Sequence, residues 1–399
     1  MALSSDIITQ NMTAAAMAAN PSALSGKRVS CDIDGDFVLD NAVIKKATFS
    51  NSKIWRSQIK NVTFEDCTFS QTHFMTTDFE NVTFRGGSIS YRPNPRYEAD
   101  DTSFEDIMFY NVVMDNVALN GAYFQLGCAN TNLTLRNLTR VRNKYTTFTI
   151  YDAKLVMDNC KGTGDFLAIL DGAESTLYVN NCEFTKYSGL GGLCRAAYIR
   201  NSKFLNFSFI GGGYKTVIEN SVLTGQIGNG NIRELYLVNN QYLPSGNSRD
   251  PWIGRAVLQA NTEGKVFLDG RNVKNANLTV TGGAVYIRDL NCVNFILANA
   301  AQDLNPQSLD LSNVVITGLR LRNLDLKSCR WENVTLNPPV ILLNTRIANF
   351  QGYNFNFPRD GSLESSSEGN MIKVIESPSP FNLPPIDAPT PEALGIRVE

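Results

Sequence analysis

A single histidine and scattered carboxylates are the side chains of this chain that could do acid–base chemistry. His73 lies in the segment THFMT, directly before a large apolar residue of a regular repeat, so its side chain is expected to face solvent. Hydrolysis of a glycosidic bond by two carboxyl groups needs them ~5–10 Å apart. The candidate pairs are Asp152 with Asp158 and Asp165 with Asp171. Their spacing is also ordinary for a solvated surface, so it does not by itself predict a hydrolase.

A lyase base or a metal site is no better supported. Arg195, Arg200 and Lys203 are close in sequence but form no motif. The chain has no phosphate-binding G-x-x-x-x-G-K-[ST], no G-x-S-x-G and no H-E-x-x-H. Its eight cysteines lack CxxC spacing, which predicts reduced thiols in the core. We therefore predict no catalytic residues, no metal and no cofactor, while glycan hydrolase or lyase activity stays open.

A column of aromatic residues is the strongest candidate binding site. Segments such as LYVNN and VYIRD carry an aromatic residue three positions before an Asn or its equivalent. If the apolar neighbours face inward, alternation puts this column on the outer face, where it could stack sugars or dock a partner. The alternatives are lateral pairing between strands and cover by the chain's own arm. The column comprises Tyr178, Tyr198, Tyr236, Phe267 and Tyr286.

A second candidate surface is the segment YRPNPRYE at 91–98, which interrupts the repeat. Insertions on repeat proteins tend to lie on the working face. The binding residues predicted there are Tyr91, Arg92, Arg96 and Tyr97.

The elements that position these residues show a period of five. The segment NVTFEDCTFSQTHFMTTDFENVTF (61–84) places a phenylalanine at every fifth residue, a period that neither a helix nor a flat strand has. Over 42–89 each fifth residue is large and apolar, and the residue two before it is small or β-branched; the pattern returns over 102–124 and 309–336. Such a period indicates coils whose sides each turn two side chains inward, and which must stack to bury them.

This pattern resembles the pentapeptide-repeat family, in which a small residue stands two positions before a central Leu or Phe. The match covers 42–124 and 309–336, about a quarter of the chain. The resemblance implies a right-handed parallel β-helix of square cross-section, with four five-residue units in each coil.

In the middle of the chain a longer repeat replaces the period of five. Aligned segments place an Asn, or once each a Gly and an Asp, about 20 residues apart, with one longer step. Asn tolerates turn conformations, and stacked amides can hydrogen-bond from coil to coil. The turn column predicted in this way is Asn159, Asn181, Asn201, Asn220, Asn239, Gly270 and Asp289, continuing to Asn313 and Asn333.

We therefore predict an all-β fold: a single-stranded right-handed parallel β-helix (solenoid), with pentapeptide-type square coils at both ends and coils of about 20 residues in the middle. One continuous β-helix is expected over 42–341, with insertion loops at 91–103 and 244–255. Residues 1–41 are expected to form an N-terminal arm and cap. Residues 342–399 are expected to form a C-terminal cap and an extended, proline-rich tail.

Net charge and hydrophobicity limit the classes of partner that this protein is expected to bind. The 399 residues carry a formal net charge of -2, whereas nucleic-acid binding needs a basic footprint. No run approaches ~18 apolar residues, so we expect no membrane span. The first residues lack a basic and then an apolar segment, so we also expect no signal peptide. These features fit a virion or the cytoplasm.

Three functions of different classes are open. The first, which the lack of catalytic motifs favours, is a non-enzymatic structural or adhesive β-helix rod built into a larger assembly, such as a virus or phage particle. Its partners would be other proteins of the assembly, further copies of itself or a glycan. The second is a bacterial pentapeptide-repeat effector or target-binding protein, as the resemblance implies. The third is a polysaccharide depolymerase or lyase of the tailspike type.

Overall fold

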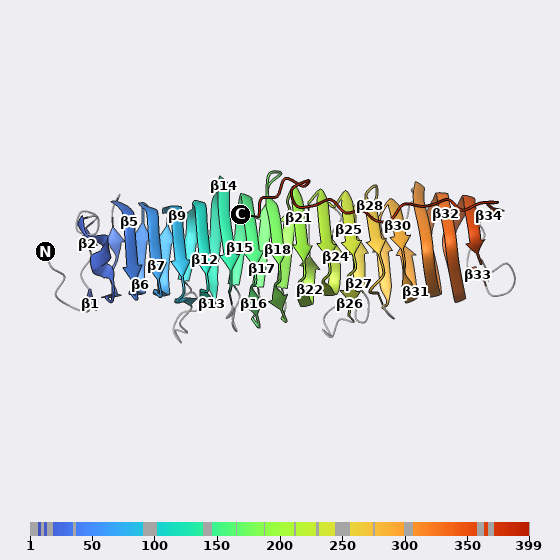
Figure 1. Cartoon of the computed structure of the whole chain (residues 1–399). Helices are drawn as coiled ribbons and strands as arrows, with labels where there is room; N and C mark the ends of the chain where they lie inside the picture. Colours follow the sequence, from blue (N-terminus) through green and yellow to red (C-terminus); the bar gives the residue numbers. More distant parts are fainter. Residues whose placement is uncertain are drawn as a thin grey trace. The chain divides into compact units, whose positions relative to one another are not determined.

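The chain is an all-β parallel β-solenoid of about 13 turns with almost no helix, which confirms the predicted fold class. It divides into unit 1 (Met1–Arg195) and unit 2 (Ala196–Arg397), apart from the last two residues. Figure 1 shows strands of adjacent coils side by side within each unit. The computed structural model describes residues 7–8, 12–13, 19–34, 37–90, 102–138, 146–164, 166–186, 188–210, 213–228, 231–243, 256–273, 276–298, 306–356, 363–365 and 371–398.

Unit 1 is made of strands that pair in parallel with the strands of the next coil. Its elements are β1 (Ile7–Ile8), β2 (Met12–Thr13), the 3-10 turn η1 (Pro21–Leu24), β3 (Arg28–Val29), β4 (Ile33–Asp34), β5 (Phe37–Lys45), β6 (Thr48–Trp55), β7 (Ser57–Glu65), β8 (Thr68–Met75), β9 (Asp78–Arg85), β10 (Ser88–Ser90), β11 (Thr102–Ile107), β12 (Phe109–Asp115), β13 (Ala118–Asn120), β14 (Ala122–Arg136), β15 (Thr146–Asp158), β16 (Lys161–Gly162), β17 (Phe166–Asp171), β18 (Thr176–Asn180), β19 (Glu183–Phe184) and β20 (Ser188–Leu193).

Unit 2 repeats this arrangement. Its strands are β21 (Ala196–Arg200), β22 (Lys203–Ile210), β23 (Lys215–Glu219), β24 (Val222–Gly228), β25 (Glu234–Val238), β26 (Gln241–Tyr242), β27 (Ala256–Gln259), β28 (Lys265–Asp269), β29 (Leu278–Thr281), β30 (Ala284–Arg288), β31 (Asn291–Ala298), β32 (Pro306–Phe355), β33 (Leu363–Ser365) and β34 (Met371–Glu376).

The phenylalanines of the five-residue repeat form the core of unit 1. Phe64 of β7 stands in register with Phe84 of β9, and their stacked rings are 5.2 Å apart at the centroids. Phe104 and Phe124 stack in the same way at 4.6 Å, and all four side chains are buried. Each Phe thus packs on the equivalent Phe of the next coil, which explains why the residue type recurs.

The small positions between these rings accept polar side chains, because the main chain satisfies them. Ser57 Oγ donates to the carbonyl oxygen of Trp55 at 2.9 Å, and Thr77 Oγ1 donates to that of Met75 at 3.0 Å. A buried hydroxyl with such a partner avoids the cost of an unsatisfied group. Serine, threonine and cysteine can therefore alternate with alanine and valine at these positions.

The asparagines of the turn column occupy the left-handed backbone region and bond from coil to coil. Asn159 and Asn181 both have φ near 52°, a conformation that Asn adopts more readily than most residues. Asn181 Nδ2 donates to Asn159 Oδ1 at 3.2 Å in unit 1, and Asn333 Nδ2 donates to Asn313 Oδ1 at 3.1 Å in unit 2. The predicted side-chain ladder is confirmed for these pairs.

Strand pairing continues where the period of five is lost. Met114 of β12 pairs with Leu135 of β14, Leu135 pairs with Met157 of β15, and Met157 pairs with Val179 of β18. All four side chains are buried. The inner column therefore tolerates any large apolar residue, and the coil does not depend on phenylalanine.

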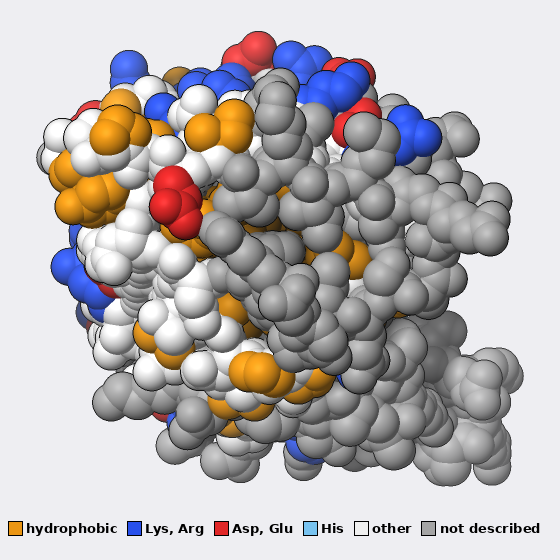
Figure 2. Space-filling view, turned by 90° about the vertical axis from the view of Figure 1, so that its right-hand side faces the viewer, with side chains coloured by type: hydrophobic (Ala, Val, Ile, Leu, Met, Phe, Trp, Pro, Cys, Tyr) orange, Lys and Arg blue, Asp and Glu red, His pale blue; other side chains and the backbone are white. Residues whose placement is uncertain are grey.

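Parallel pairing extends beyond both limits predicted for the coils, 42 and 341. At one end β3 pairs with β6, and β1 with β3. At the other end β33 and β34 both pair with β32. These strands are short and lack the repeat, so no sequence signal indicated them. Figure 2 views the end of unit 2 that carries β34 and shows Lys and Arg side chains gathered along its upper edge.

The predicted insertion loops lie mostly outside the described residues. The loop at 91–103 is shorter than predicted, because Thr102 and Ser103 belong to β11 and are buried. Residues 91–101 and 244–255 fall outside the described part of the chain.

Replacing Phe104 by alanine is expected to destabilise unit 1 by ~3–5 kcal/mol, because a buried ring is removed from between two stacked neighbours. Urea denaturation followed by circular dichroism measures this loss. Tyr110→Ala is the control, because Tyr110 is 47% exposed and its loss is expected to cost ~0.5 kcal/mol or less. Equal effects of the two substitutions would contradict the stacked core.

Candidate functional site

Three rings of the predicted aromatic column lie together on the outer face of unit 2. Tyr236 of β25 stands in register with Phe267 of β28, and Phe267 with Tyr286 of β30. The ring centroids are 4.5 and 4.9 Å apart and the planes are nearly parallel. The rings are half-buried, whereas their strand neighbours Leu235 and Leu237 are fully buried. Alternation along the strands therefore points the rings outward.

The other two residues of the column lie differently. Tyr198 of β21 is separated from Tyr236 by Val217, is 5% exposed, and donates its hydroxyl hydrogen to Glu219 Oε1 at 2.9 Å. Tyr178 belongs to β18 of unit 1 and is 2% exposed. The five residues therefore do not form one exposed stripe, because a buried aliphatic side chain and close packing interrupt it. We call Tyr236, Phe267 and Tyr286 the aromatic column.

The C-terminal tail, residues 377–397, runs back along unit 2 beside the aromatic column; in Figure 1 it is the dark red trace that passes β32, β30 and β25. Phe381 N–H donates to Glu332 Oε2 of β32 at 3.1 Å. Arg288 Nε of β30 donates to the carbonyl oxygen of Pro384 at 2.9 Å. These contacts place the tail over the row of residues two positions beyond the aromatic column.

The later part of the tail reaches the earlier coils of unit 2. Burial raises the pKa of Tyr236 to about 12, with further contributions from Glu234 and from Asp387 of the tail. The pKa of Glu392 is lowered first by its own backbone hydrogen bond, then by Thr390, and least by the charge of Arg200 on β21. The hydrogen bonds to Glu332 and Arg288 and the trace in Figure 1 show that the tail runs opposite to the direction in which the coils advance.

Buried charges lie under the tail. Arg288 is 6% exposed and Asp310 of β32 is 3% exposed. Arg288 Nη1 donates to the carbonyl oxygens of Ile287 at 2.9 Å and Asp310 at 3.2 Å, while the Asp310 carboxylate accepts from Arg330. Glu332 is 9% exposed. Charged groups on an outer face are costly to bury unless they are bonded, and the tail supplies bonds to Arg288 and Glu332.

The tail fits this surface through alternate apolar side chains. Asn382 and Asp387 are exposed. A turn near its end, in which Gly395 N–H donates to the carbonyl oxygen of Glu392 at 2.9 Å, places Leu394 and Ile396 in buried positions. The half-buried side chains before the turn include Phe381, Leu383, Ile386 and Ala388. Sequence reasoning expected an extended tail and gave cover of the aromatic column by the chain's own arm as an alternative, but it did not identify the C-terminal tail as that arm; the apolar spacing of the tail is a signal for this contact.

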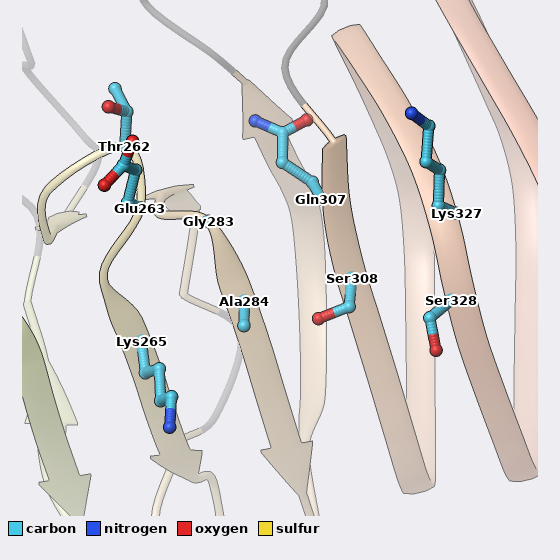
Figure 3. A pocket seen from close by; sticks show the side chains of 9 residues that line it. All are labelled: Thr262, Glu263, Lys265, Gly283, Ala284, Gln307, Ser308, Lys327 and Ser328. Carbon is cyan, nitrogen blue, oxygen red and sulfur yellow. The ribbon is translucent and has the colours of Figure 1, made fainter.

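A cleft of about 500 Å³ lies on the other side of the aromatic column. Its floor is made of small residues, Ala284 of β30 and Ser308 of β32, which follow Lys265 of β28 in register. Figure 3 shows Lys265 and Lys327 on opposite sides of this floor and Gln307 above it. Gln307 is 6% exposed, and its Oε1 makes no hydrogen bond. The cleft can offer hydrogen-bond donors and acceptors to a polar ligand.

The structure places two of the remaining sequence candidates, His73 and Asp152. His73 Nδ1 lies 2.8 Å from Ser103 Oγ, and Asp152 occupies a turn with φ of 44°. Asp165 and the predicted loop residues Tyr91, Arg92, Arg96 and Tyr97 fall outside the described residues. Burial raises the pKa of Cys194 to about 12, as for a thiol of the core.

The described residues contain no group of three or more His, Cys, Asp or Glu side chains that could bind a metal ion. No helix among them has the length and hydrophobicity needed to cross a membrane.

Comparison with known protein families, curated proteins and solved structures finds no match to this chain.

We expect the phenol of Tyr236 to titrate near pH 12 rather than near ~10, because burial disfavours its anion. The unfolded chain loses this proton first, so the contribution of the neutral phenol to stability is complete below ~pH 10 and falls as the pH rises toward 12. The difference in ultraviolet titration between the wild type and Tyr236→Phe measures the pKa. A difference centred near ~10 would contradict the burial of this ring.

Proposed function

We propose that this protein is a non-enzymatic structural or adhesive β-solenoid that is built into a larger assembly, most concretely a virus or phage particle. The observation that carries the proposal is the seating of the proline-rich tail along the outer face of unit 2. Binding of an extended, proline-containing segment beside aromatic side chains is one mode of protein–protein recognition. The outer face of this solenoid is thus suited to holding protein chains.

The outer charges of unit 1 favour a scaffold over a charged target mimic. Lys45 pairs with Glu65 at 3.2 Å, and Lys60 pairs with Glu80 at 3.2 Å. Both pairs join residues of adjacent coils, so positive and negative charges alternate along the face. A protein that imitates nucleic acid needs one continuous sign of charge, which these rows do not provide.

Protein purified from its natural source under mild conditions is expected to co-purify in a complex with other proteins or with further copies of itself. Native mass spectrometry measures the masses and stoichiometry, and cryo-electron microscopy of the same sample locates the solenoid. A population made of single, unassociated chains at all concentrations would contradict the proposal.

An adhesive role is a second candidate, favoured by the position of the cleft. Phe267 and Tyr286 lie two residues beyond Lys265 and Ala284 on the same strands, so the cleft and the aromatic column share one face. A sugar can place an apolar side on an aromatic ring while its hydroxyl or carboxylate groups bond to neighbouring polar side chains. This arrangement suits a glycan bearing hydroxyl and carboxylate groups.

A glycan array probed with the full chain is expected to reveal binding to acidic glycans. Lys327→Ala should weaken this binding ~10-fold or more, because a charge-assisted hydrogen bond is lost. Lys161→Ala is the matched control, because Lys161 is an exposed lysine of unit 1. An equal effect of both substitutions, or release of shorter oligosaccharides from the bound glycan, would contradict the adhesive role.

A further inference from the structure

We propose that the groove of unit 2 that holds the tail is a receptor for the tail of a second copy, so that neighbouring chains are linked by exchanging tails. The groove is defined by Arg200, Arg288 and Glu332 together with the aromatic column. This inference rests on the proposed function and names one partner within it, a further copy of this chain.

The contacts that hold the tail can be reproduced by any copy. Two hydrogen bonds join the main chain of the tail to side chains of the coils, from Phe381 to Glu332 and from Arg288 to Pro384. Apolar side chains of the tail, including the buried pair Leu394 and Ile396, add further contacts. A tail from another chain would make the same contacts, as in domain swapping, where the exchanged element is identical.

A groove that has lost its own tail exposes apolar surface to water. Arg288 and Glu332 are at least nine-tenths buried, and each gives or accepts a hydrogen bond to the main chain of the tail. Release of the tail exposes both charged groups to water, which can solvate them, but it also exposes the apolar side chains of the tail, including the buried Leu394 and Ile396, and the apolar surface that they cover. Burying this apolar surface again favours the binding of a second tail.

The segment that joins β34 to the tail permits release of the tail while the coils stay paired. Ser377 N–H donates to the carbonyl oxygen of Gly352 at 2.7 Å, and this is where pairing with β32 ends. The residues that follow, Pro378, Ser379 and Pro380, are exposed. In dilute solution the chain's own tail occupies the groove in preference to the tail of a second copy, because a short linker gives it an effective concentration in the ~millimolar range. Exchange is therefore expected where copies are crowded, as in an assembly.

The test uses two full-length variants that cannot satisfy their own groove. The tail variant carries Leu394→Asp and Ile396→Asp, which leaves its groove empty. The groove variant carries Arg288→Gln and Glu332→Gln, which leaves its tail free. Native mass spectrometry of the mixture is expected to show a 1:1 complex that neither variant forms alone. The control mixture pairs the groove variant with a chain that carries all four substitutions, and it should show no complex.

Limited proteolysis at the tail checks that each variant has released it, and circular dichroism checks that the coils are intact. If the groove variant fails to fold, a labelled peptide with the sequence of residues 377–398 replaces it and is titrated onto the tail variant. The proposal is overturned if neither the released tail nor the peptide binds to the tail variant. It is also overturned if the tail of the tail variant stays protected from proteolysis. A natural assembly that the groove variant still joins would leave the proposed function standing and remove only tail exchange.

Discussion

The register between neighbouring coils is the constraint on which the rest of the structure depends. Because parallel strands pair residue to residue, a side chain stacks on its equivalent one coil away, and any property of one position is repeated along a column. Phe104 on Phe124 and Asn159 on Asn137 are two outcomes of this single rule. Asn137 and Asn159 occupy turns at positive φ, and the side-chain amide of Asn159 donates to that of Asn137. Core, turns and outer rows are therefore set together.

The same register organises the outer face of unit 2 into parallel rows. Along β28 and β30 the first row is small or basic and borders the cleft, the second is aromatic, and the third ends in charged residues such as Arg288. Each row offers one kind of chemistry over several coils. The tail follows the third row because an extended chain can run along the stacking direction and meet one equivalent residue after another.

The parts of this architecture that repeat were predictable from sequence, and the parts that occur once were not. The period of five from Ile44 to Ile89 and the spacing of Asn159 and Asn181 each report a contact made many times. The short strands β3 and β34 each pair without a periodic signal. The bond from Arg288 to Pro384 joins residues 96 apart, and nothing in either local segment indicates the other. The outward aromatic residues were predictable as a column, but the buried Val217 interrupts it and only packing reveals this.

The tail also explains how charged residues can be buried on an outer face, where strand side chains are usually in contact with water. Burial lowers the pKa of Arg288, which shows that its surroundings disfavour the charge that the neighbouring carbonyl oxygens stabilise. An apolar residue at this position would pack against an extended segment but could not select a carbonyl group of that segment. Arg288 instead donates a hydrogen bond to a main-chain carbonyl oxygen of the tail. Glu332 accepts a hydrogen bond from a main-chain N–H of the tail at a second point. Two such points set the direction and register of the tail, while its apolar side chains supply most of the contact area.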